Sequence, residues 1–152
     1  MIAIKKSETA DTRSCDWSKV TEEQLKQSSM QHKADVMQGI FFFMDQLEEA
    51  GKRHDNDKIT GIKDFHADFQ TGFAQTDWWD NHRKIARHHL LTDDGIPEDV
   101  NLIDVLDMIT DCVMAGMGRA GSVYPLEIKP ETLKRAFDNT VELLKSQIVV
   151  EG

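Results

Sequence analysis

Cysteine, proline and long apolar runs are all scarce in this chain. Its 152 residues include only two cysteines and three prolines. Cys15 and Cys112 lie far apart in the sequence, which is not a disulfide framework, so we expect a reducing setting such as the cytoplasm. The longest apolar run, residues 40–44, is too short to cross a membrane. The N-terminal segment has two lysines but no apolar stretch after them, so it is not expected to be a signal peptide.

Positive charge is also in short supply. The chain has 27 acidic against 18 basic side chains, a formal net charge of -9. Such an excess repels a polyanion, so non-specific binding to nucleic-acid phosphates is not expected. A small phosphorylated ligand remains compatible with this charge if cations gather in one pocket. Bound metal ions could neutralise part of the acidity.

Strand-like alternation, internal repeats and low-complexity segments are absent, whereas helical spacing of apolar residues recurs. Val36, Ile40, Met44 and Leu47 show it best, after a capping-box pattern at residues 21–24. The sequence therefore predicts an all-α fold, a single-domain bundle of about five main helices over residues 21–152. Residues 1–20 are expected to form an extended arm. The predicted helices are 21–50, 59–73, 77–91, 98–117 and 130–148.

Histidines and aspartates mark the region where chemistry is expected. All six histidines lie between residues 32 and 89, and imidazole is the commonest protein ligand for zinc-like metals. Asp104, Asp107 and Asp111 recur at three- and four-residue steps, so they share a stripe on the predicted fourth helix. Three carboxylates in one line repel each other, and a cation between them relieves that repulsion.

The predicted third helix carries a second concentration of such residues. His82, His88 and His89 can approach the same edge of it, although adjacent helical residues point about 100° apart. We therefore expect one of His88 and His89, rather than both, to face a site. Arg83 and Arg87 lie on the same segment and could meet an anionic substrate.

The pattern of these residues resembles the HD-domain metal-dependent phosphohydrolases. The motif of that family reads here as His32, then the doublet His54-Asp55, then Asp111, with Lys58 in the position of the His-Asp-x-x-Lys variant of the HD-GYP branch. The later runs "RHHLLTDDGIP" and "LIDVLDMITDCVMA" are similar to that branch as well. The Gly-Tyr-Pro element is absent, and the spacing between the two parts is short.

The resemblance implies a chemistry and a set of roles. One or two divalent ions (Mn, Fe, Co, Zn or Mg) would be held by residues that are ligands in the family: His32, His54, Asp55, His82, His88, His89 and Asp111. Asp55 would bridge two ions, with Asp57 in proton transfer or orienting the ligands. Lys58, Arg83 and Arg87 would offset the charge of a phosphate. The expected activity is hydrolysis of a nucleotide phosphomonoester or phosphodiester.

The chain as a whole also resembles a small protein of T-even bacteriophages, which implies the cytoplasm of an infected host. Three alternatives to a hydrolase or to a metal site remain open. The chain could be a non-catalytic protein that binds a host factor, or it could sequester a nucleotide without turning it over. The doublet "HD" could also be a hydrated turn and the aspartate stripe a solvated helix face. A homodimer is compatible with the pattern.

Overall fold

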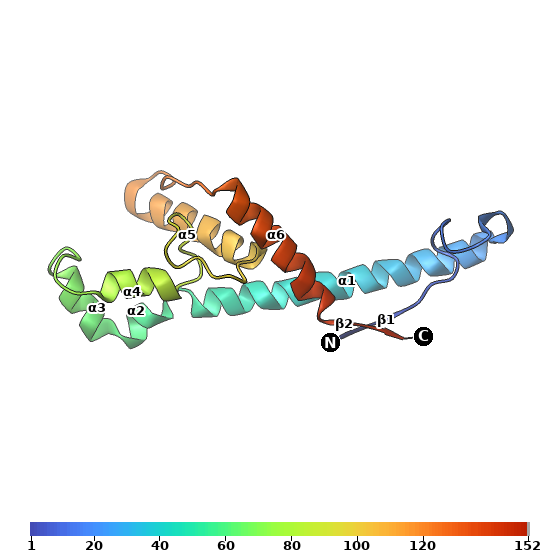
Figure 1. Cartoon of the computed structure of the whole chain (residues 1–152), viewed down its shortest axis with the longest axis horizontal. Coiled ribbons are helices and arrows are strands. Elements are labelled where there is room, and N and C mark those ends of the chain that lie inside the picture. The colour runs from blue at the N-terminus through green and yellow to red at the C-terminus, as the bar shows by residue number, and fades with distance from the viewer. Residues whose placement is uncertain (152) are drawn as a thin grey trace. The chain divides into compact units, whose positions relative to one another are not determined.

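The computed structural model describes residues 1–151 and is mostly helical, which confirms the predicted all-α fold class (Figure 1). Its helices and strands, in chain order, are β1 (Ile2–Lys5), a short 3-10 helix (Trp17–Lys19), α1 (Glu22–Arg53), α2 (Asn56–Thr60), α3 (Ile62–Phe69), α4 (Trp78–Ile85), α5 (Leu102–Ala120), α6 (Pro130–Lys145) and β2 (Ile148–Glu151). The chain divides into two compact units. The first comprises residues 1–45 and 142–152, and the second comprises residues 46–141.

The first unit contains the only sheet among residues 1–151. β1 and β2 pair in parallel, with Ile2 opposite Ile148. The prediction of a last helix reaching residue 148 is therefore wrong, because α6 ends at Lys145. The β-branched run that begins at Ile148 favours a strand once a partner is at hand, and that partner comes from the other end of the chain.

The predicted capping box at the start of α1 is confirmed. The Thr21 hydroxyl accepts a hydrogen bond from the Gln24 backbone amide at 3.2 Å, and the Gln24 side chain accepts one from the Thr21 amide at 3.0 Å. Together they satisfy two donors that a helix start leaves without a partner. Further along, a Cβ at position 39 would lie 3.7 Å from the Leu144 side chain, so the end of α6 packs against α1 within the first unit.

The second unit begins with a sharp break in the helix. His54 follows the last residue of α1, and Asp55 adopts a left-handed conformation (φ 53°) before α2 begins at Asn56. The predicted helix over 59–73 is divided between α2 and α3 at Gly61. A Cβ at position 61 would lie 3.0 Å from the Asp57 carbonyl oxygen, so this turn favours a residue without one.

A buried carboxylate fixes the start of α4. Asp68 is fully buried and accepts hydrogen bonds from the backbone amides of Thr76 (3.2 Å) and Trp79 (3.1 Å). Burial alone would raise the pKa of Asp68, but the hydrogen bonds of Thr76 and Trp79 outweigh it and hold the pKa below its usual range. Asp68 therefore anchors the helix that carries His82.

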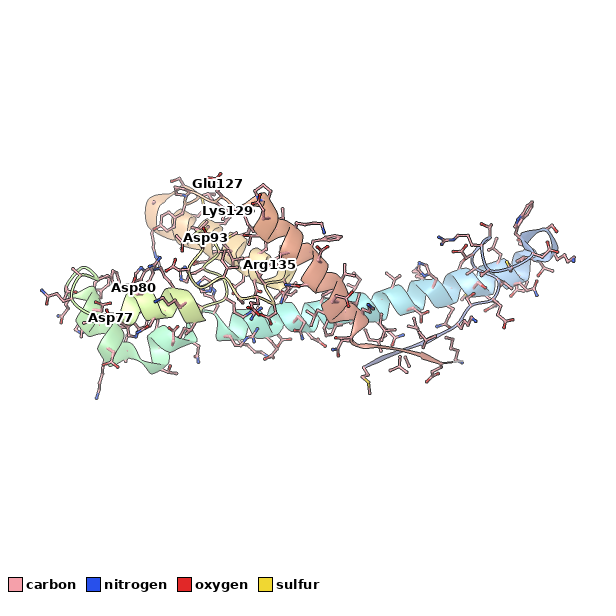
Figure 2. All side chains as sticks on the ribbon, in the orientation of Figure 1. Asp77, Asp80, Asp93, Glu127, Lys129 and Arg135 are labelled. Carbon is pink, nitrogen blue, oxygen red and sulfur yellow. The ribbon has the colours of Figure 1, made fainter. Side chains whose placement is uncertain are left out.

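The hydrophobic core lies between α5, α6 and the loop that precedes α5. Its buried members are Leu90, Val100, Val105, Met108, Cys112 and Ala136. A full capping box of Asn101 and Asp104 starts α5, and the Leu102 amide donates to the Thr140 hydroxyl of α6 at 2.8 Å. At the surface Lys129 pairs with Asp93 at 2.6 Å (Figure 2). These contacts fix α5, which supplies Asp107 and Asp111. No helix within residues 1–151 is long and apolar enough to cross a membrane.

Candidate metal centre

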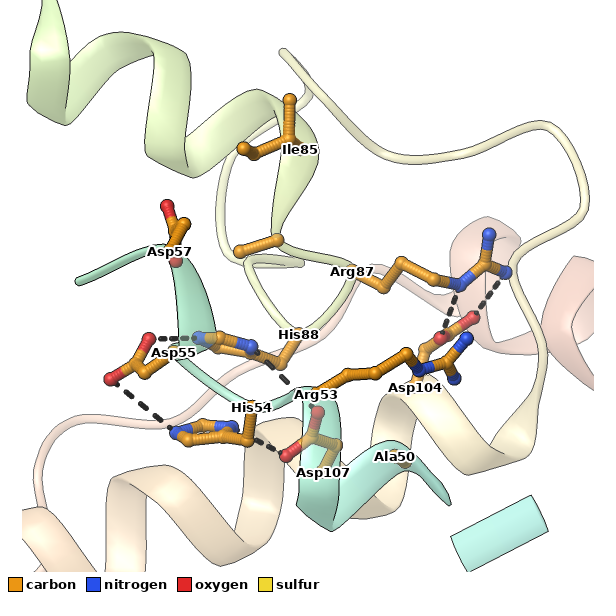
Figure 3. Close-up of a pocket in the computed structure, with 11 residues that line it drawn as sticks. Ala50, Arg53, His54, Asp55, Asp57, Ile85, Arg87, His88, Asp104 and Asp107 are labelled. Carbon is orange, nitrogen blue, oxygen red and sulfur yellow. Dashed lines mark hydrogen bonds and ion pairs between the residues drawn. The ribbon is translucent and has the colours of Figure 1, made fainter. Parts of the chain in front are cut away.

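Residues from distant parts of the second unit converge on one partly buried cluster, of which Figure 3 shows His54, Asp55 and His88. The junction of α1 and α2 provides His54 and Asp55, α4 provides His82, the turn after α4 provides His88 and His89, and α5 provides Asp111. Three overlapping groups of these side chains, one of which includes Asp57, bring their ligand atoms within 4.8 Å of one another. The chain thus has clusters of histidine and aspartate that could hold a metal ion.

The first position, which we call centre A, is formed by His54, Asp55 and Asp111. The His54 Nε2 atom lies 3.6 Å from Asp55 Oδ2 and 3.6 Å from Asp111 Oδ1. Two ligand atoms that share an ion at about 2.0–2.2 Å lie about 3.0–3.6 Å apart in tetrahedral or octahedral geometry. Both distances from His54 fit that range, and His54 and Asp111 also form, with His88, one of the groups whose ligand atoms lie within 4.8 Å of one another.

The second position, centre B, is formed by His82, His88 and His89 together with the other oxygen of Asp55. Asp55 Oδ1 lies 3.4 Å from His82 Nε2 and 3.6 Å from His88 Nε2. The Nε2 atoms of His82 and His89 are 3.0 Å apart. The two oxygens of Asp55 therefore point to different centres, which is the arrangement that a carboxylate bridging two ions requires.

Two further aspartates hold histidines in a defined orientation. His54 Nδ1 is 2.8 Å from Asp107 Oδ1, and His82 Nδ1 is 2.7 Å from Asp57 Oδ2. In each pair the imidazole N–H donates to the carboxylate, which leaves the Nε2 lone pair free for a metal. Histidine ligands in metal sites are oriented by this type of partner. Asp57, one of the predicted catalytic residues, contacts His82 in this way.

Burial favours the neutral form of the histidines in centre B. Burial, reinforced by the neighbouring imidazoles, lowers the pKa of His88 to about 3. It lowers the pKa of His89 to about 4, with the charges of His82 and Lys58 adding to the effect. Both rings are therefore unprotonated near neutral pH, and only unprotonated imidazole binds a metal.

The pKa values of Asp55 and Asp107 are shifted in opposite directions. Burial would raise the pKa of Asp55, but the hydrogen bond and charge of Lys58, whose Nζ lies 2.6 Å from Asp55 Oδ2, hold it below its usual range. Burial raises the pKa of Asp107, and repulsion from Asp111 and Asp104 adds to this while His54 opposes it. Asp55 is thus held as the anion that a metal bridge needs.

Two atoms of the cluster are buried without any hydrogen-bond partner: Asp55 Oδ1 and His88 Nε2. They lie 3.6 Å apart and face the same point. A buried polar atom without a partner costs about 1–3 kcal/mol, so two of them side by side call for a common partner. A cation satisfies both, because each atom offers a lone pair.

The predicted ligand His32 is not among the residues that the second unit brings together. His32 is exposed, lies on α1 in the first unit, and belongs to none of the candidate groups among residues 1–151.

The two arginines predicted to bind substrate are engaged with aspartates. Arg87 forms a two-pronged contact with the buried Asp104 (2.7 and 2.9 Å) and reaches Asp99 at 3.0 Å. Arg83 contacts Asp80 at 2.9 Å and Asp94 at 3.5 Å. Arg87 lines the pocket of Figure 3, but its guanidinium stabilises the start of α5.

A second pocket, of about 220 Å³, adjoins both centres and contains residues that the sequence reading missed. Its lining includes the acidic or imidazole side chains Asp55, His89 and Asp111, and also Lys58, Arg119 and Tyr124. Arg119 has no ion-pair partner among the residues that the structure describes. Its position in the last turn of α5, two turns after Asp111, was the available signal for it.

The pocket of Figure 3 lies against the other side of the cluster. It has a volume of about 270 Å³, and Asp55 and His88 line it as well as the second pocket. Arg53, at the end of α1, lies on its wall (Figure 3). The cluster is thus reachable from two sides.

Comparison with known proteins finds no family model that matches the chain, no similar curated protein and no similar solved structure.

Proposed function

We propose that the chain is a metal-dependent phosphohydrolase acting on a phosphomonoester or phosphodiester of a nucleotide. The observation that carries the proposal is the pair of partnerless buried atoms, Asp55 Oδ1 and His88 Nε2, within a ring of histidines and aspartates spaced as metal ligands. Without an ion these two atoms have no compensation for their burial. A purely structural cluster would be expected to pair these atoms with each other or with the backbone.

Centres A and B together have the ligand set of a two-metal hydrolase. His54, Asp55 and Asp111 would hold one divalent ion, and His82, His88 and His89 would hold the other, with Asp55 between them. Divalent ions in such a pair lower the pKa of bound water and neutralise the charge that develops on a transferred phosphoryl group. Asp57 and Asp107 orient His82 and His54 and so keep the ligand geometry fixed.

The second pocket supports a phosphorylated substrate. Lys58 and Arg119 supply positive charge beside the centres, and the Lys58 ammonium also lies 5.5 Å from the centre of the Trp79 ring. Trp79 and Tyr124 offer flat surfaces in the same pocket, where a base or sugar could pack. A nucleotide requires cationic side chains for its phosphate and flat aromatic rings for its base, and this pocket offers both. A nucleoside monophosphate or a signalling nucleotide, in the cytoplasm of an infected host, fits this proposal.

The proposal is tested by measuring metal and turnover in the same samples. Elemental analysis of protein loaded with Mn²⁺ is expected to give two ions per chain. His88→Gln and Asp111→Asn each should lose at least one of them. His66→Asn, an exposed histidine outside the cluster, is the matched control and should retain both.

Phosphate release is then followed over a panel of nucleoside monophosphates and cyclic dinucleotides. The wild type and the His66→Asn control should turn over at least one compound, and the two ligand variants should not. A wild type that binds no more metal than His88→Gln would refute the metal centre. Full metal loading with nucleotide binding but no product would instead favour the sequestering function.

A further inference from the structure

The first unit carries a broad apolar surface on α1. Six large apolar side chains there are between 46% and 57% exposed: Met30, Val36, Met37, Ile40, Phe41 and Met44. At 100° per residue they fall within an arc of about 140° on the helix. We call this surface the α1 stripe. It lies on the part of α1 that the first unit contains (Figure 1).

The stripe is not the side of α1 that packs against the rest of its own unit. Gly39 and Phe42 lie on the other side of the helix and are less exposed, and a Cβ at position 39 would lie 3.7 Å from the Leu144 side chain of α6. The stripe is therefore a second apolar face, beside the one that packs within the unit. An exposed apolar patch of this size is typical of an interaction surface.

The exposed area is large enough for a stable interface. Half of a large apolar side chain amounts to about 100 Å², so six of them expose about 600 Å². A specific protein interface buries about 800 Å² on each partner. The apolar side chains of the stripe alone supply about three quarters of that area.

We propose that the α1 stripe is a self-association surface, on which α1 of a second copy of this chain packs in the antiparallel direction. The charges along the helix favour this occupant. Lys26 and Lys33 lie toward the N-terminal end of the stripe and Asp45 lies at its C-terminal end. A two-fold axis near Gln38 and Gly39 brings the basic end of each copy to the acidic end of the other.

Parallel pairing and a lipid surface both fit less well. A parallel pair would place Lys33 against Lys33. An anionic lipid surface would be repelled by a chain with net charge -9. In the antiparallel pair Met37 of one copy faces Ile40 of the other, so the widest part of the stripe covers itself. Neither Lys33 nor Asp45 has an ion-pair partner among residues 1–151, and both are free to take one across the axis.

The test is the mass of the full chain in solution, measured by sedimentation equilibrium from about 1 to 100 µM, a range in which a standard-size interface is expected to associate. The wild type should be a dimer, and Ile40→Glu should be a monomer with an unchanged helical circular dichroism spectrum. Gln38→Glu adds the same charge at an exposed position outside the stripe, and it should remain a dimer. A monomeric wild type, or a dimer that survives Ile40→Glu, would overturn the proposal.

The direction of pairing is tested by exchanging charges. Lys33→Glu and Asp45→Lys should each weaken the dimer several-fold, because each places like charges together. The double variant should restore most of the affinity. If the double variant loses as much dimer affinity as the two single variants combined, the two ends do not meet and the antiparallel arrangement is excluded. These measurements require no metal and no turnover, so they stand apart from the proposed hydrolysis.

Discussion

Replacement of Arg87 by methionine should destabilise the protein by about 2–3 kcal/mol. The guanidinium binds Asp104 through two hydrogen bonds, and Asp104 is only 5% exposed. Removing one partner of a buried pair costs about 3–5 kcal/mol, because the remaining charge is left uncompensated. Arg87 keeps about a third of its side chain exposed, and Asp104 retains the Asn101 amide, so the loss should lie below that range.

Thermal unfolding followed by calorimetry measures this loss. For a chain of this length, 2–3 kcal/mol lowers the melting temperature by about 5–10 °C. Arg83→Met is the matched control, because its partner Asp80 is exposed and a surface pair contributes about 0–1 kcal/mol. Adding Asp104→Asn to Arg87→Met should recover part of the loss by removing the orphaned charge. The reasoning is refuted if Arg87→Met costs no more than Arg83→Met.

Three further substitutions or conditions test other parts of the second unit. Gly116→Ala should cost about 1–3 kcal/mol in urea unfolding, because its Cβ would clash with the Ser122 carbonyl oxygen. A Cβ at Gly118 meets nothing within 4 Å, so Gly118→Ala should gain about 0.5–1 kcal/mol. Equal effects of the two substitutions would contradict the packing. The metal-free protein should lose stability as pH falls from about 6.5 toward 4. Over this range His88 and His89 become protonated in the unfolded chain but not in the folded one, where their pKa values are about 3 and about 4. Glutamine at both positions should flatten the dependence of stability on pH. Val100→Ala should cost about 2–3 kcal/mol by calorimetry, because Val100 is fully buried and the substitution removes two buried methyl groups. A cost below 1 kcal/mol would show that the core relaxes around the cavity.

The all-α fold could be predicted because helical periodicity and caps are local. The Thr21–Gln24 capping box needs only four consecutive residues, and it starts α1 as expected. The pairing of Ile2 with Ile148 could not be predicted, because it depends on two termini meeting. Ile148 has the apolar character of a helix face and of a strand alike, and only its partner decides between them.

The convergence of His88 and His89 shows why part of the cluster could not be predicted. On a helix the two rings would diverge by about 100°, and the predicted helix extended to residue 91. In the structure α4 ends at Ile85, and both histidines lie in the turn that follows. The chain there is not bound by helical geometry, so both Nε2 atoms can approach His82 and Asp55.

His32 and the doublet His54-Asp55 differ in what the structure does with them. The doublet follows the end of α1 and lies in the second unit with the rest of the cluster, whereas His32 lies in the first unit and joins no candidate group among residues 1–151. The resemblance also implied His82, His88 and His89 as ligands, and the structure brings these three side chains together.

The left-handed backbone at Asp55 decides which substitution is suitable for testing the metal centre. Aspartate and asparagine tolerate a positive φ better than other residues with a side chain, whereas alanine there adds a backbone penalty of about 1 kcal/mol. An alanine variant would confuse the loss of a bridging ligand with a loosened joint between α1 and α2. Asparagine keeps the joint and removes the negative charge, which weakens both the metal bridge and the contact with Lys58. Asp55→Asn therefore perturbs the site without loosening the backbone.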